Sequence, residues 1–240
     1  MSPPSTRFLA AFNEIEDYLR AALRADEHVE FGKLARVYAD KKRLRTSQRD
    51  ALQAFASLRN AITHGRYYGG HPIAEPVPDV VDQIERLRDQ IKSPPKALAV
   101  LGVINVCVAR PDEPISTVLE HVRLFDYSQL PVYDETGCIG ILTTNAIARW
   151  LAHQLTINKG LAEEEPVSRV MGFAERHERA LLVRGSITAT EAIDLLSHGG
   201  KDGTAVTALI LTDSGKNTEK PIRVIVSADL PSLTAALEFT

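Results

Sequence analysis

The sequence pattern with the clearest chemical potential is Arg59-Asn60-Ala61-Ile62-Thr63-His64, near the end of an amphipathic segment. Histidine titrates near neutral pH and can act as acid or base, and guanidinium binds phosphate oxygens through paired hydrogen bonds. These two groups suit metal-free cleavage of RNA, because a 2′-hydroxyl must lose a proton and a charged phosphorane must be stabilised. In a regular helix His64 would point about 140° away from Arg59. Two chains packed together could still bring both side chains to one phosphate.

A structural interpretation of the same residues stays open. Arg59 falls on the apolar stripe of its helix, where a charge is costly unless it is paired or faces a cleft. It could therefore pair with an acidic residue of the first predicted helix. The candidates are Glu14, Glu16 and Asp17. His64 could simply favour the negative end of the helix dipole beside Gly65.

A basic run precedes this pattern. Five cations lie within nine positions: Lys41, Lys42, Arg43, Arg45 and Arg49. The chain has a net charge of −3, but residues 1–96 hold 16 Lys and Arg against 13 Asp and Glu. A local basic patch on such a chain suggests a surface for RNA, or else a solvated connection between helices. Tyr67, Tyr68 and His71 follow in a glycine-rich loop and could stack on bases or pack on the bundle.

The elements that must position these residues are helices. Apolar residues recur at steps of three and four over residues 5–25, 31–41, 47–64 and 79–91. Ser47 could cap the third helix, with Asp50 at capping-box spacing, and Val80 is expected inside the fourth. Four amphipathic helices predict a small bundle, which ends at Ser93-Pro94-Pro95 because two prolines cannot continue a helix.

The rest of the chain is a tandem repeat with the order strand-helix-strand-strand-helix. The first copy has expected strands at 103–108, 130–133 and 138–142, and helices at 115–125 and 145–155. The second has strands at 180–183, 206–211 and 222–226, and helices at 188–197 and from 229. Two such copies are expected to pack together, because one alone leaves an apolar sheet face open.

Several stretches of this repeat resemble a known family. They are Glu165–Met171 (EPVSRVM), Leu130–Gly137 with Gly140–Thr143, and the weaker matches Ala208–Gly215 and Ile225–Leu230. Together they resemble a pair of CBS (cystathionine beta-synthase-type) domains. The resemblance implies that AMP, ADP or ATP, or another adenosine-containing ligand, binds in clefts between the two copies as a regulatory ligand, without a metal.

The residues that would bind this ligand follow from the resemblance. Thr143 stands at the family's hydroxyl position, but Ala146 stands where the ribose-binding Asp is expected, and Asn145 is an imperfect substitute. In the second copy Asp229 occupies the carboxylate position, with Ser227 nearby and with Ile187 and Thr188 at the head of a helix. Two alternatives remain: Asp229 is only a helix cap, or neither site binds and the pair is a dimerisation module.

The Arg59 pattern resembles the R-x4-6-H motif of HEPN domains, many of which are metal-independent ribonucleases that work as dimers. The resemblance implies that His64 is the acid or base, that Arg59 stabilises the phosphorane and that Asn60 orients one of them.

We therefore expect an α+β protein of two domains. The predicted parts are a HEPN-like bundle (1–92), a linker (93–97), a first CBS domain (98–158) and a second CBS domain (159–240). The expected function is a homodimeric, cytoplasmic regulator in which an adenine nucleotide controls an RNA-cleaving bundle. The alternative is a non-catalytic binding or dimerisation module with a helical scaffold. No apolar run is long enough for a membrane span, and Cys107 and Cys138 are expected to be buried thiols.

Overall fold

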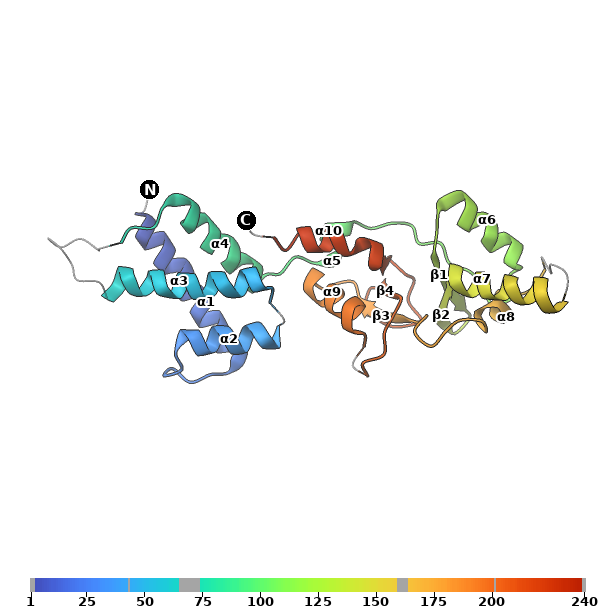
Figure 1. The fold of residues 1–240 in the computed structure, drawn as a ribbon, viewed down its shortest axis with the longest axis horizontal. Coiled ribbons are helices and arrows are strands. Elements are labelled where there is room, and N and C mark those ends of the chain that lie inside the picture. The colour runs from blue at the N-terminus through green and yellow to red at the C-terminus, as the bar shows by residue number, and fades with distance from the viewer. Residues whose placement is uncertain (1–2, 43, 65–73, 159–163, 201, 239–240) are drawn as a thin grey trace. The chain divides into compact units, whose positions relative to one another are not determined.

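A computed structural model of the chain describes residues 3–42, 44–64, 74–158, 164–200 and 202–238 (Figure 1). They form two compact units, of which one runs to Pro94 and includes Glu238, and the other comprises Pro95–Leu237. The predictions for Arg43, Tyr67, Tyr68 and His71 concern residues outside the described ranges. Within those ranges no helix is both long enough and apolar enough to cross a membrane.

The described part of the N-terminal unit contains the four predicted helices. They are α1 (Pro4–Leu23), α2 (Phe31–Lys41), α3 (Thr46–His64) and α4 (Pro78–Lys92). Helix α1 contacts the other three (Figure 1). Its fully buried stripe of Phe8, Phe12, Ile15 and Leu19 is the centre of the core. The spacing of the apolar residues thus predicts this half correctly.

Two details of the bundle differ from the prediction. Helix α3 begins at Thr46, so Ser47 lies inside the first turn and does not cap it. The buried side chain of Gln48 instead accepts a hydrogen bond from the backbone N–H of Arg45 at 3.2 Å. In α4 the buried stripe begins at Val81 rather than at Val80, which is only half-buried. It continues through Ile84, Leu87 and Ile91.

The first repeat of the C-terminal unit is built around one antiparallel hairpin. It comprises α6 (Ile115–Phe125), β1 (Gln129–Asp134), β2 (Gly137–Thr143) and α7 (Thr144–His153), which a π-helical turn, η1 (Gln154–Asn158), follows. Leu130 pairs with Leu142 and Val132 with Gly140. The buried residues Val118, Leu142 and Trp150 belong to one core. The predicted strand over 103–108 is wrong, since only Ala109 bridges to β1 and the side chains of Val103, Ile104 and Val108 are exposed.

The second repeat contains a three-stranded sheet. Its elements are β3 (Ala180–Arg184), α9 (Ala189–His198), β4 (Ala208–Thr212), β5 (Arg223–Val226), a 3-10 turn η2 (Ser227–Asp229) and α10 (Leu230–Ala235). Strand β4 lies in the middle, parallel to β3 and antiparallel to β5. All five residues of β4 are buried. This buried sheet therefore supports the turn η2 that follows β5.

Each repeat packs against the short helix that precedes the other repeat in the sequence. Helix α5 (Ala97–Leu101) precedes the first repeat, yet Ala97 is buried in the core of the second and its N–H bonds to the Ile187 carbonyl at 2.9 Å. Helix α8 (Val167–Met171), the EPVSRVM stretch, precedes the second repeat, yet Val167 and Val170 are buried in the core of the first. The chain thereby ties the two repeats together reciprocally.

A second tie joins the hairpin turn of the first repeat to the loop before β5. The N–H of Cys138 donates to the carbonyl oxygen of Asn217 at 2.8 Å. Glu219 holds this loop through hydrogen bonds from the N–H and hydroxyl of Ser214, which lower the pKa of its carboxyl to about 2. The loop before β5, which belongs to the second repeat, therefore contacts the first repeat.

The substitution Gly137→Ala is expected to destabilise the C-terminal unit by about 1–3 kcal/mol. Gly137 has a φ of +127°, and an added Cβ would lie 2.4 Å from the Asn217 carbonyl oxygen. Unfolding in urea, followed by the fluorescence of Trp150, measures this, because Trp150 is the single tryptophan and is buried in the first repeat. Gly200→Ala is the control in the same unit, since its Cβ would come no closer than 3.2 Å to another group, the flexible side chain of Asp202. An equal loss in both variants would contradict the prediction.

Candidate functional site

Asp229 lies directly after β5, where its carboxylate is held by two contacts. One oxygen accepts from the backbone N–H of Val226 at 2.9 Å, and the other accepts from the guanidinium of Arg223 at 3.1 Å. The two side chains are only 16% and 14% exposed. Strand β5 carries Arg223 and the turn η2 carries Asp229, so these two elements orient the half-buried ion pair.

Arg223 also fixes the end of α5. Its guanidinium donates to the carbonyl oxygens of Leu101 at 2.8 Å and of Gly102 at 3.4 Å. The next two residues, Val103 and Ile104, follow as exposed apolar side chains that are 70% and 44% accessible. The carboxylate and the guanidinium therefore lie beside the end of α5, and an exposed apolar segment follows that end in the chain. Ser227, in the same 3-10 turn as Asp229, is exposed beside them.

Ile187 and Thr188 have structural roles at the opposite end of α5. Ile187 is buried, and its carbonyl binds the first residue of α5. Thr188 caps α9 in a reciprocal pair with Glu191, whose N–H donates to the threonine hydroxyl at 3.2 Å. A shallow cavity of about 320 Å³ adjoins Ile187, Glu191 and Asp194. Because α5 is five residues long, about 7 Å of helix separates these residues from Arg223 and Asp229.

The candidate residues of the first repeat, Thr143 and Asn145, contact Glu178, which no sequence motif marks. Thr143 is buried and caps α7 by accepting from the N–H of Ala146 at 3.0 Å. Its hydroxyl donates to the carboxylate of Glu178 at 2.8 Å. Asn145 is exposed, and its side chain hydrogen-bonds the same carboxylate. The hydroxyl of Thr143, which a ligand would contact in this repeat, is therefore already hydrogen-bonded to the carboxylate of Glu178.

Glu178 is charged although it is buried. Burial raises the pKa of its carboxyl, but hydrogen bonds from the Glu175 N–H and from Thr143, together with the charge of Arg149, outweigh that effect, and the pKa lies below its ordinary value. Arg149 donates to Glu178 at 2.8 Å and pairs with Glu175 at 2.7 Å. No sequence signal identifies Glu178, because it lies in the connection between α8 and β3. Arg223 lies within an expected strand, six residues before Asp229.

In the bundle, Arg59 and Asn60 line an open cleft. The Arg59 guanidinium lies 5.9 Å from the centre of the Phe12 ring and donates to the Asn60 side-chain oxygen at 3.3 Å. The cleft is about 540 Å³ and lies between α1, the loop before α2, and α3. His64 is the last residue of α3. Among the proposed acidic partners, Glu14 pairs with Lys92 and Glu16 pairs with Arg20.

The described residues of the basic run differ in their surroundings. Lys41 and Lys42 are exposed at the end of α2, and Arg45 is half-buried. Arg49 is committed to structure: it pairs with Asp40 and donates to the carbonyl oxygens of Leu44 and Ala39 at 2.9 Å each. Its guanidinium joins α2 to α3, so removing it would affect folding as well as any contact with RNA.

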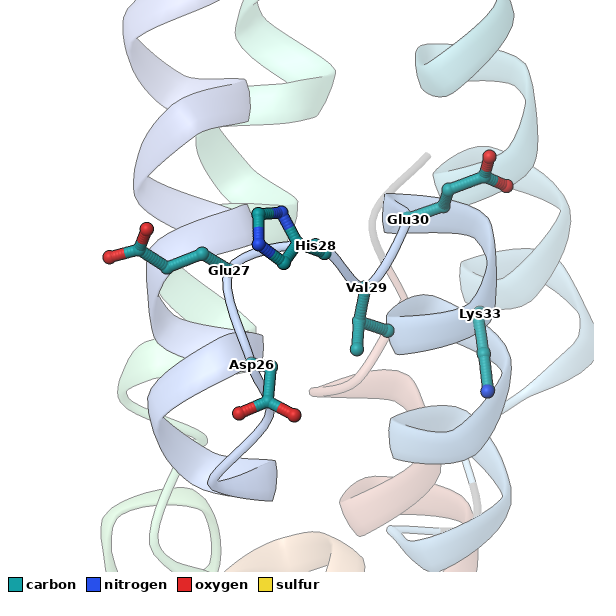
Figure 2. Close-up of a pocket in the computed structure, with 6 residues that line it drawn as sticks. All are labelled: Asp26, Glu27, His28, Val29, Glu30 and Lys33. Carbon is teal, nitrogen blue, oxygen red and sulfur yellow. The ribbon is translucent and has the colours of Figure 1, made fainter.

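A further pocket of about 630 Å³ lies beside the loop between α1 and α2. Figure 2 shows that the side chains of Asp26, Glu27 and Glu30 point in different directions. Among the residues that the structure describes, no group of three His, Cys, Asp or Glu side chains could hold a metal ion. Cys107 and Cys138 are free and half-buried rather than fully buried, and burial raises the pKa of both thiols.

Comparison with known families identifies one part of the chain. The family model described as "CBS domain" matches residues 103–153, which include α6, β1, β2 and α7. This region is therefore a CBS domain, which confirms the resemblance for the first repeat. No curated protein matches the sequence.

Several solved structures resemble the C-terminal part of the chain. CBSX2 in complex with AMP is 20% identical, with 54% of this chain and 87% of that chain covered and a TM-score of 0.38. The CBS domain pair of protein MJ0100, in complex with 5-methylthioadenosine and S-adenosyl-L-methionine, is 14% identical over 60% and 100%, with a TM-score of 0.41. The CBS-domain containing protein ATU1752 from Agrobacterium tumefaciens is 16% identical over 55% and 84%, with a TM-score of 0.38. At these values the likeness says nothing about a ligand of this chain.

Proposed function

We propose that the C-terminal unit binds an adenine nucleotide (AMP, ADP or ATP) at the end of β5, in the second of two CBS domains. The proposal rests on one observation, the half-buried pair of Arg223 and Asp229 at the end of α5, from which the exposed Val103 and Ile104 continue the chain. A site for a nucleotide needs an acceptor for ribose hydroxyls, a cation for phosphate and an apolar surface for the base. These four residues supply all three.

The chemistry of each group fits this role. A carboxylate has about four lone-pair positions, so Asp229 can accept from ribose hydroxyls while it still binds Val226 and Arg223. A guanidinium forms charge-assisted hydrogen bonds with phosphate oxygens. The Ser227 hydroxyl adds a further donor in the same turn. The resemblance to CBS domains, on which Asp229 was first selected, implies the same ligand class.

A regulatory role is suggested by the short segment that joins α4 of the bundle to α5. Arg223 contacts the last residue of α5, and α5 follows α4 of the bundle after only Ser93–Lys96. A ligand that engages Arg223 acts on the end of α5, and therefore on the segment that leaves the bundle. We propose that the protein is a homodimeric nucleotide sensor that uses this connection to control the bundle.

Thermal unfolding of the full chain with AMP, ADP, ATP or S-adenosylmethionine tests the proposal. A ligand present at about 100 times its Kd should stabilise the native C-terminal unit by about 2.7 kcal/mol. Trp150 fluorescence reports the unfolding of this unit. If no adenine ligand changes the transition, the repeats serve assembly alone, which is the competing interpretation.

We further propose that the bundle is a HEPN-like ribonuclease domain. The observation in its favour is that Arg59 and Asn60 line an open cleft, with His64 at the end of the same helix. In the dimer Arg59 would stabilise the phosphorane, His64 would act as acid or base, and Asn60 would orient one of them. The exposed Lys41 and Lys42, with Arg45, would attract the RNA backbone.

Arg59→Ala and His64→Ala are each expected to abolish cleavage of a labelled single-stranded RNA, assayed with and without the stabilising nucleotide. The physical reason is that one loses the cation for the phosphorane and the other the proton-transfer group. Arg86→Ala is the control, because Arg86 is an exposed arginine of α4 in the same unit. If the wild-type chain cleaves no RNA, or if both variants cleave as well as it does, the bundle is a scaffold.

A further inference from the structure

The start of α7 in the first repeat is an anion site that is already filled. The Glu178 side chain is only 1% exposed. One of its oxygens accepts from the Thr143 hydroxyl at 2.8 Å, and the other accepts from Arg149 at 2.8 Å and from the Glu175 N–H at 2.7 Å. Asn145 adds a further hydrogen bond. Both oxygens of the carboxylate therefore accept hydrogen bonds from the protein.

These donors are the set that a phosphate group would use. A hydroxyl at a strand end, a guanidinium, a side-chain amide and a backbone N–H surround one anion at the N-terminus of a ten-residue helix. The helix dipole favours negative charge at that position. The donors come from both the repeat itself and the connection to the next one, so the anion they surround is inside the fold.

The place corresponds to the proposed nucleotide site of the second repeat. Thr143 ends β2 and lies three residues before Ala146, just as Val226 ends β5 and lies three residues before Asp229. In the second repeat the carboxylate belongs to the turn, and its side chain is 16% exposed against 1% for Glu178. In the first repeat the carboxylate comes from Glu178, 35 residues later, and faces inward onto the donors.

We propose that Glu178 is the built-in occupant of the first repeat's ligand site and excludes phosphate-containing ligands from it. Each chain then binds one nucleotide, at Asp229, rather than two. A nucleotide could enter the first site only by displacing a buried, charged carboxylate from all its donors, which is costly. This inference rests on the proposed function, because it takes the end of β5 as the nucleotide site.

Calorimetric titration of the full chain with AMP tests this. Wild type should bind one equivalent and Asp229→Ala none. Glu178→Ala should bind a second, weaker equivalent, because the freed donors then hold the phosphate although Ala146 offers no acceptor to the ribose, and the double variant should bind this weaker equivalent alone. Glu175→Ala is the matched control: it removes a neighbouring carboxylate that also pairs with Arg149 but leaves Glu178 in place, so it should bind one equivalent. Trp150 fluorescence establishes that each variant is folded.

Glu178→Gln is the second variant, to be used if Glu178→Ala does not fold. The amide keeps the side-chain volume and removes the charge that repels phosphate, so a weaker second equivalent is expected. The inference is overturned if wild type binds two equivalents, or if the folded Glu178 variants bind no more than wild type. If wild type binds none while Glu178→Ala binds one, the proposed site at Asp229 fails and the role of Glu178 stands.

Discussion

Asp229→Ala should weaken the binding of AMP by at least about 100-fold. The carboxylate is the acceptor for the ribose hydroxyls, and a hydrogen bond to a charged group contributes about 1.5–3 kcal/mol. The substitution also leaves the half-buried Arg223 without its acidic partner, so the guanidinium is no longer held between η2 and the end of α5. Isothermal titration calorimetry of the full chain measures the loss.

Two further variants separate binding from folding. Asp213→Ala removes the same charge from an exposed position in the same unit and should bind AMP as wild type does. Asp229→Asn keeps an oxygen that can accept from the Val226 N–H, so it should fold like wild type and still bind weakly. If Asp229→Asn binds AMP with the affinity of wild type, Asp229 is only a cap for the turn, and the site lies elsewhere.

Leu209→Ala should destabilise the C-terminal unit by about 3–5 kcal/mol, the cost of a cavity at a fully buried leucine. Leu209 lies in β4, the central strand between β3 and β5, and none of its surface is exposed. Because β5 pairs with β4, the turn with Asp229 loses support as the sheet weakens. Urea unfolding followed by Trp150 fluorescence measures the change.

The control is a leucine of the same unit in the opposite environment. Leu124 in α6 is 58% exposed, so Leu124→Ala should cost less than about 1 kcal/mol. Comparable losses in the two variants would mean that β4 is not the base of the second repeat. A loss of AMP binding in Leu209→Ala that precedes unfolding would show that the site depends on the geometry of β5.

Local sequence patterns predicted most elements, since helix periodicity and strand composition act over short distances. Helices 31–41 and 115–125 have the predicted bounds. The strand over 103–108 failed, because apolar composition alone does not form a strand without a partner edge. Leu101 and Gly102, just before this run, are bound by Arg223, and only Ala109 reaches β1.

The candidate site was predictable to the same extent. Thr143 and Asp229 could be selected because the resemblance to CBS domains implies a hydroxyl and a carboxylate at those positions. Arg223 and Glu178 could not, because their importance depends on contacts with Leu101 and Thr143, which are 122 and 35 residues away. Nothing in the residues around Glu178 indicates that its carboxylate is buried.

The sequence by itself determined the four-helix half, the repeated order of strands and helices, and the CBS domain at 103–153. Only the tertiary structure decided which pieces share a core. Helix α5 packs on the second repeat and α8 on the first, because each short apolar helix buries its side chains where a sheet leaves space rather than beside its neighbours in sequence. That exchange brings Arg223 to the end of α5. The connection that leaves α8 carries Glu178 to Thr143, so the carboxylate of the second repeat comes from its own turn and that of the first from a residue 35 positions after Thr143.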